Sequence, residues 1–95
     1  MSQVKIGDVV KIKFYSDPGH GWAAVKRKFL DELAITDKIS TYSYQRGKTV
    51  YLEEDCDFSV LINALKARGD TFEIVEKHTD NTHPIRSYDY YRKNG

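Results

Sequence analysis

Residues 39–57, ISTYSYQRGKTVYLEEDCD, decide the fold because they join a predicted β-hairpin to the start of a predicted helix. Two runs rich in β-branched and aromatic residues, 39–45 and 49–53, are typical of strands. The turn between them, over residues 45–48, contains Gly47, which can adopt the positive φ that tight hairpin turns require. We therefore expect two antiparallel strands joined by this turn.

Carboxylates crowd the exit of this hairpin at Glu53, Glu54, Asp55 and Asp57, around the single cysteine, Cys56. We expect Asp55 or Asp57 to cap the following helix by accepting a backbone N–H bond, since negative charge is favourable at a helix N-terminus. Alternatively, such carboxylates can bind a divalent cation or share a proton, and the thiol can have a lowered pKa. The run lacks the spacing of a calcium-binding loop, which favours capping and a solvated acidic rim.

Apolar side chains at helical spacing predict two helices. Residues 58–68 carry one apolar stripe, and Gly69 follows where a helix ends in a left-handed residue. Residues 26–35 form a second amphipathic pattern with basic residues in its first turn. The two stripes consist of Phe58, Leu61, Ile62 and Leu65, and of Phe29, Leu30, Leu33 and Ala34.

The remaining strands follow from alternation and from turn residues. Residues 9–15 alternate apolar side chains with lysines, as a strand with one buried face does. A turn at residues 17–19, with positive φ expected at Gly19, leads to a short strand over residues 20–25. Residues 71–77 are the last predicted strand. The fold class is therefore α+β, with the order ββαββαβ, a mostly antiparallel sheet and two helices on one face.

The length of 95 residues and the mass of 11.0 kDa suit one domain over residues 1–95. Residues 79–95 are polar and irregular, and within this tail we expect Ile85, Tyr88 and Tyr91 to pack back on the body. No stretch has the length or hydrophobicity of a signal peptide or a membrane span. A lone cysteine also suits a reducing compartment, so the cytoplasm is the expected location.

Charge is distributed unevenly although the net charge is only +1. Residues 1–30 carry six basic and two acidic side chains, whereas residues 31–57 carry three basic and seven acidic ones. We expect one basic and one acidic face, and the overall balance disfavours wholesale coating of nucleic acid.

The segment DPGHGW, residues 17–22, is the first candidate site. Glycines on both sides of His20 would leave its imidazole unshielded, and Asp17 could orient the ring for acid–base chemistry beside Trp22. This arrangement would suit a small, nucleotide-type ligand or a weak enzyme. In the alternative interpretation the glycines serve backbone geometry and Trp22 anchors the core, which the absence of a second catalytic group at a recognised spacing favours.

Tyrosines supply the second and third candidates, because their rings are apolar and their hydroxyls polar. Tyr42 and Tyr44 are two residues apart and would share a strand face, which with Glu53 and Glu54 could bind a protein partner. Ordinary cross-strand packing is the competing explanation. In the tail, a single-stranded nucleic acid could be bound by Arg86, Tyr88, Tyr90 and Arg92.

We expect neither a metal nor another cofactor. The three histidines, His20, His78 and His83, could be drawn with Cys56 as a zinc site, but their spacing matches none of the paired zinc patterns.

In the segments DPGHGW and YLEEDCD, at residues 17–22 and 51–57, the chain resembles a family of small uncharacterised proteins encoded by bacteriophages and prophages. The resemblance extends over nearly the whole chain and includes HTDNTHPIRSYDYY at residues 78–91. It implies a phage accessory protein in the cytoplasm of an infected bacterium. Proteins of that kind often bind a host component, and they include inhibitors of host defence. We therefore expect a non-enzymatic protein that binds a host or phage macromolecule.

Overall fold

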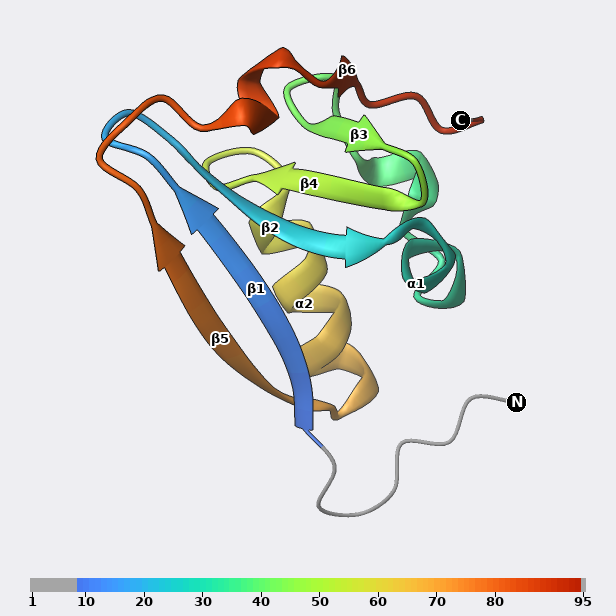
Figure 1. The fold of residues 1–95 in the computed structure, drawn as a ribbon. Coiled ribbons are helices and arrows are strands. Elements are labelled where there is room, and N and C mark those ends of the chain that lie inside the picture. The colour runs from blue at the N-terminus through green and yellow to red at the C-terminus, as the bar shows by residue number, and fades with distance from the viewer. Residues whose placement is uncertain (1–8, 95) are drawn as a thin grey trace.

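A six-stranded sheet in the order β5-β1-β2-β4-β3-β6 organises residues 9–94, the part of the chain that the computed structural model describes (Figure 1). The elements in chain order are β1 (Val9–Ser16), β2 (Gly21–Lys26), α1 (Arg27–Glu32), the 3₁₀ turn η1 (Thr36–Lys38), β3 (Tyr44–Arg46), β4 (Thr49–Glu53), α2 (Phe58–Arg68), β5 (Thr71–His78), the 3₁₀ turn η2 (Pro84–Ser87) and β6 (Asp89–Tyr90). This confirms the predicted α+β class and the order ββαββαβ, to which the structure adds a short sixth strand.

Helix α2 covers one face of the sheet and supplies most of the helical part of the core (Figure 1). The alternation predicted for residues 9–15 is confirmed, since Ile12 is fully buried between exposed lysines. From the helices, Leu30 of α1 and Leu61 and Leu65 of α2 enter the same core cluster, so both helices contribute to one side of the sheet. Gly69 ends α2 with φ of 81°, as predicted.

The sheet is antiparallel except for one pair. Strand β5 returns beside β1 in parallel, with Ile12 opposite Ile74, after the chain has crossed over through α2. Strands β1, β2, β4 and β3 pair with their neighbours in antiparallel register. Among residues 9–94 both helices lie on one side of the sheet, so the face opposite α2 is open except where the C-terminal tail crosses it (Figure 1).

The predicted hairpin exists, but its first strand was placed too early. Strand β3 begins at Tyr44, and residues 39–43 form a loop instead of a strand. Because Arg46 pairs with Thr49, the connection is the two residues Gly47 and Lys48, one residue later than predicted. Gly47 has φ of 59°, which confirms the positive φ expected there.

Two other local predictions need correction. Helix α1 ends at Glu32, earlier than the predicted residue 35, because Ala34 adopts a left-handed φ of 58° that interrupts the helix. The turn at residues 17–19 forms without positive φ at Gly19. There the Asp17 carboxylate accepts hydrogen bonds from the backbone N–H groups of Gly19 and His20, which closes the turn through a side chain.

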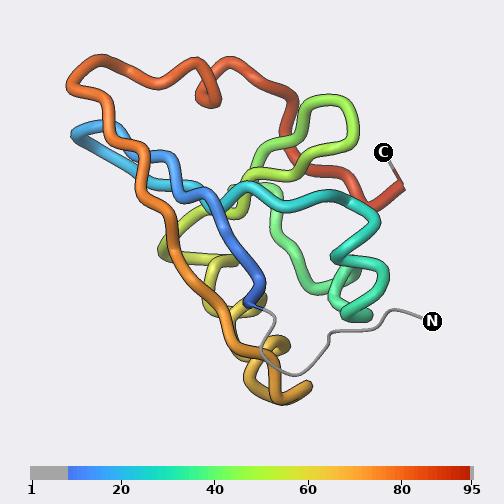
Figure 2. The backbone as a smooth tube through the Cα atoms, turned by 60° about the horizontal axis from the view of Figure 1, so that its bottom comes forward, coloured from blue at the N-terminus to red at the C-terminus, as the bar shows by residue number. Residues whose placement is uncertain are grey.

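The tail lies on the body and does not hang free (Figure 2). After β5 it crosses the end of the sheet, forms η2 and pairs with β3 through β6. Ile85 and Tyr91 are almost completely buried, and Tyr88 is half-buried, which confirms the packing expected for these three residues. The Tyr91 hydroxyl donates a hydrogen bond to the Thr36 carbonyl, 2.7 Å away.

Candidate binding site

A hollow of about 330 Å³ lies where β2 begins and β4 ends. It combines residues that the sequence placed in three separate candidate sites. Its lining consists of His20, Trp22, Tyr42, Tyr44, Glu53, Asp55, Cys56 and Arg86. We call this feature the acidic hollow, because two carboxylates, Glu53 and Asp55, line it. Glu54, which the sequence grouped with them, is not among the lining residues, and its Oε1 lies near Gly21 instead.

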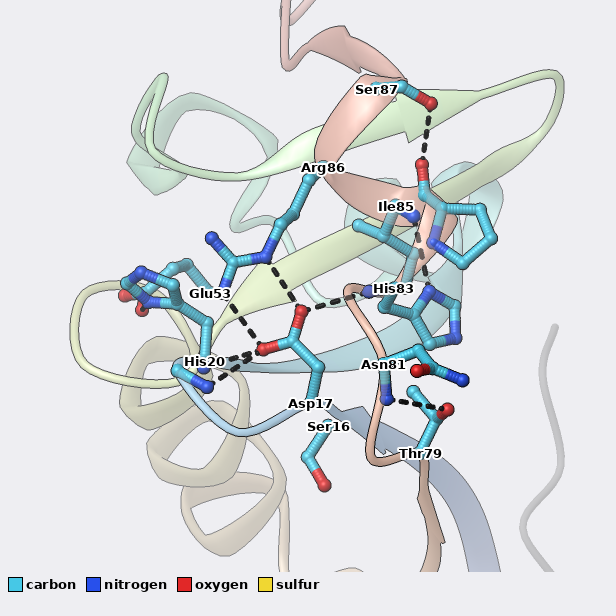
Figure 3. Close-up of polar contacts among 12 residues, drawn as sticks. Ser16, Asp17, His20, Glu53, Thr79, Asn81, His83, Ile85, Arg86 and Ser87 are labelled. Atoms are coloured by element: carbon cyan, nitrogen blue, oxygen red, sulfur yellow. Dashed lines mark hydrogen bonds and ion pairs between the residues drawn. The ribbon is translucent and has the colours of Figure 1, made fainter.

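An ion pair between Asp17 and Arg86 forms one wall of the acidic hollow (Figure 3). The guanidinium donates two hydrogen bonds, from Nε to Asp17 Oδ2 at 2.7 Å and from Nη2 to Oδ1 at 2.8 Å. The same carboxylate accepts the backbone N–H groups of Gly19, His20 and His83. Asp17 thus ties the tail to the β1–β2 turn, and it does not orient the His20 ring as the sequence suggested.

The glycines beside His20 have structural roles. A Cβ on Gly19 would lie 2.7 Å from Nη2 of Arg86, and a Cβ on Gly21 would lie 2.5 Å from the Phe14 ring. Close packing against a guanidinium and an aromatic ring therefore explains both glycines. The interpretation that they leave space for a ligand is not needed.

The pKa of Asp17 is held far below its ordinary range, chiefly by the hydrogen bond from Arg86, and further by the backbone N–H of His83. A folded-state pKa below the unfolded-state pKa means that the carboxylate stabilises the fold fully above the unfolded value, near pH 4. That contribution is lost as the pH falls toward the folded value.

We therefore expect Asp17→Asn to destabilise the protein at pH 7, with a deficit that shrinks steadily below about pH 4. Urea unfolding of wild type and variant across this range measures the deficit. Asp55→Asn is the matched control, because Asp55 is exposed and has no ion-pair partner among residues 9–94. A deficit at Asp17 that does not change with pH would contradict the prediction.

Glu53 lies at the base of the acidic hollow and is almost fully buried. Its Oε1 accepts the backbone N–H groups of Asp55 and Cys56, which holds the chain in a tight turn before α2. Its Oε2 lies 3.6 Å from Nδ1 of His20, whose side chain is half exposed. The carboxylate that faces His20 is therefore Glu53, which comes from a different strand and not from the adjacent Asp17.

Asp57 occupies the N-cap position of α2, yet it makes no side-chain capping bond, so the capping prediction is wrong for Asp55 and for Asp57. Its carboxylate turns toward the loop of residues 39–43 and accepts hydrogen bonds from the backbone N–H and Oγ of Ser40 and from Oγ of Ser43. Ser43 Oγ in turn accepts the backbone N–H of Glu53. This buried network gives the loop the shape that presents Tyr42.

Tyr42 is 69% exposed and is not in a strand, so the prediction that Tyr42 and Tyr44 share a strand face is wrong. Both nevertheless line the acidic hollow. Tyr44 stacks on Tyr90 with ring centroids 5.6 Å apart and meets the edge of Trp22 at 6.3 Å. Tyr44 is thus held rigidly, whereas the Tyr42 ring is free to contact a partner.

The residues predicted for nucleic-acid binding do not gather at one place. Arg86 is bound to Asp17, and its guanidinium lies over the Trp22 ring at 5.7 Å. Tyr88 packs on Tyr51 at 5.3 Å, and Tyr90 packs on Tyr44. The last member of the set, Arg92, is exposed and lies 4.0 Å from the Asp89 carboxylate.

Cys56 is not an activated thiol. Desolvation and the neighbouring carboxylates, Glu53 first among them, raise its pKa, contrary to the lowering considered from its position before a helix. Within residues 9–94 no group of three histidine, cysteine or carboxylate side chains is arranged to hold a metal ion. Sequence reasoning missed the Ser40–Ser43–Asp57 network and the Asp17–Arg86 pair, because their members are distant in sequence and form no local motif.

Comparisons of the chain with models of known protein families, with curated proteins and with solved structures found no match. Among the helices that the structure describes, none has the length and hydrophobicity needed to cross a membrane.

Proposed function

We propose that the protein is a non-enzymatic accessory protein of a bacteriophage, which binds a host or phage protein in the cytoplasm of the infected bacterium. The phage setting is supported by the resemblance at residues 17–22 and 51–57. The single observation that carries the binding role is that the exposed Tyr42 lines the acidic hollow together with Asp55, an exposed carboxylate with no ion-pair partner among the described residues. Exposed aromatic rings are enriched at protein interfaces.

The partner surface that fits the acidic hollow is basic. A lysine or arginine side chain entering it would meet Glu53 at the base, Asp55 on the wall and the Tyr42 and Tyr44 rings beside it. Such a cation would gain both ion pairing and ring contacts. A volume of about 330 Å³ accommodates one or two side chains of a partner.

Binding is favoured over catalysis by the way in which the candidate catalytic groups are used. The charge of Asp17 is neutralised by Arg86, and one carboxylate oxygen of Glu53 accepts hydrogen bonds from two backbone N–H groups. The Cys56 pKa is raised, so its thiolate is scarce at neutral pH. These groups build the hollow and keep its shape.

A small ligand in the same hollow is the second candidate, because Nε1 of Trp22 is buried and has no hydrogen-bond partner. A ligand acceptor reaching Nε1 would satisfy it. Thermal-shift measurements with nucleotides and other metabolites test this alternative, since any ligand that binds the folded state raises Tm. A Tm that no such ligand changes leaves protein binding as the function of the hollow.

Capture of a partner from a lysate of infected cells tests the main proposal. We expect Tyr42→Ala to weaken binding about 10- to 30-fold, the effect of losing one aromatic hot spot, and Tyr42→Ala with Asp55→Lys to abolish capture. Both side chains are exposed, so the fold should be unaffected. Glu76→Lys is the matched control, because Glu76 is an exposed carboxylate on β5 that does not line the hollow. Capture of the same partner by the double variant would overturn the proposal.

A further inference from the structure

A second and larger hollow, of about 560 Å³, lies apart from the acidic hollow. Its lining residues come from β1, β2, α1 and β4. Four of its lining residues are lysines, which come from β1, from β2 and from the first turn of α1: Lys11, Lys13, Lys26 and Lys28. We call it the lysine hollow.

The positive charge of the lysine hollow is not neutralised within the described residues. No ion pair joins any of its four lysines to a carboxylate in residues 9–94. Glu32 is the acidic residue of the lining, and its Oε2 is engaged by Arg68 at 3.1 Å. Glu73 stands next to Lys11 in the parallel register of β5 and β1 and reduces the local charge by one. The hollow therefore retains an excess of cations that attracts an anion.

Aromatic rings border the same lysines. Tyr15 and Tyr51 lie with ring centroids 6.4 Å apart and line the hollow from β1 and β4. Strand β2 lies between the two strands that carry these rings, and its Ala24 pairs with Lys13 on one side and with Tyr51 on the other. The small side chain of Ala24 leaves a shallow depression beside the rings. Desolvation raises the pKa of Tyr51, so its hydroxyl is neutral at physiological pH and adds no negative charge.

We propose that the lysine hollow binds single-stranded nucleic acid, with phosphates on the lysines and a base on the ledge formed by Tyr15 and Tyr51. Cationic side chains beside aromatic rings on an open sheet face are the combination that binds single strands without reading a duplex groove. Lys11 and Lys13 are two residues apart on one strand, about 6.5 Å, so they can contact successive phosphates. A mononucleotide would need cations that converge on one phosphate, whereas these are spread over three elements.

The site does not depend on the acidic hollow. It differs from the nucleic-acid site predicted in the tail, since Arg86, Tyr88, Tyr90 and Arg92 do not line it. The two hollows carry opposite charge, so an anionic strand would be drawn to the lysine hollow and repelled from the acidic one. The molecule could then hold a nucleic acid and a basic protein at the same time.

Fluorescence anisotropy with the full chain and a labelled oligothymidylate of about ten nucleotides tests this inference. We expect log K to fall with log salt with a slope of about −2 to −3, as three or four phosphate contacts on a single strand give. In the double variant that combines Lys11→Gln and Lys13→Gln, the magnitude of the slope should fall by about 1.4, and the affinity at low salt should weaken roughly 10-fold. An abasic oligomer of equal length should bind more weakly, because it cannot stack.

Lys38→Gln with Lys66→Gln is the matched control, since it removes the same charge from surfaces that do not line the hollow. Its binding should equal that of the wild type. Equal losses of affinity in the two double variants would overturn the assignment of nucleic-acid binding to the lysine hollow. Equal binding of the abasic oligomer would overturn the stacking ledge, and competition by ATP as strong as by the oligonucleotide would overturn the choice of a strand over a mononucleotide.

Discussion

Trp22→Ala is expected to lower the free energy of unfolding by about 3 to 5 kcal/mol, the range for truncating a buried aromatic side chain. Trp22 is 2% exposed and stands at the centre of the aromatic cluster on the open face of the sheet. Its ring lies 6.3 Å from Tyr44 and 6.1 Å from both His20 and His83, and the Arg86 guanidinium covers it. Its loss would loosen the acidic hollow and the tail together.

Trp22→Phe separates ring packing from the indole N–H. Because Nε1 has no hydrogen-bond partner, phenylalanine loses volume but no hydrogen bond, and we expect a cost of only about 1 to 1.5 kcal/mol. Urea unfolding followed by far-UV circular dichroism measures both variants, since Trp22 is the only tryptophan and its fluorescence is lost with it. If Trp22→Phe costs as much as Trp22→Ala, Nε1 has a hydrogen-bonding role that the geometry does not show.

Asp57→Ala is expected to cost about 3 kcal/mol, although Asp57 makes no helix-capping bond. The change removes the acceptor of the Ser40 N–H, the Ser40 hydroxyl and the Ser43 hydroxyl, and leaves these partly or fully buried groups unpaired. Chemical denaturation measures the loss. Because this loop carries Tyr42, capture of the partner should weaken in the same variant.

The comparison for Asp57 is Asp55→Ala, two residues earlier in the same acidic run. Asp55 is exposed, so its removal should change stability by less than about 0.5 kcal/mol. Equal effects at the two positions would show that the charge of the run matters and that the loop network does not.

Local patterns in the sequence predicted most of the elements. The alternation of apolar and charged residues located β1, and the apolar stripe located α2. Positive φ was expected at Gly47 and Gly69, and these are the two glycines that have it among the described residues. Each of these features depends on residues only a few positions apart, where sterics and periodicity decide the outcome. The class and the element order followed from them.

Long-range contacts decided what the sequence did not show. Whether Asp57 capped its own helix or bound Ser40, 17 residues away, depended on the path of the loop. The bond between Asp17 and Arg86 spans 69 residues and has no spacing that marks it. Of the residues proposed from the sequence as site residues, six line the acidic hollow, namely His20, Trp22, Tyr42, Tyr44, Glu53 and Arg86. That they lie together, and what each of them contacts, came from the tertiary structure.

The parallel pairing of β1 with β5 also bears on how the chain folds as it is synthesised. Strand β1 ends at Ser16, yet its partner β5 is complete only at His78, more than sixty residues later. One edge of β1 therefore stays unpaired until β5 has been synthesised, and pairings this distant in sequence form slowly. The exposed lysines along that strand oppose mispairing in this interval, because like charges discourage nascent chains from pairing with one another.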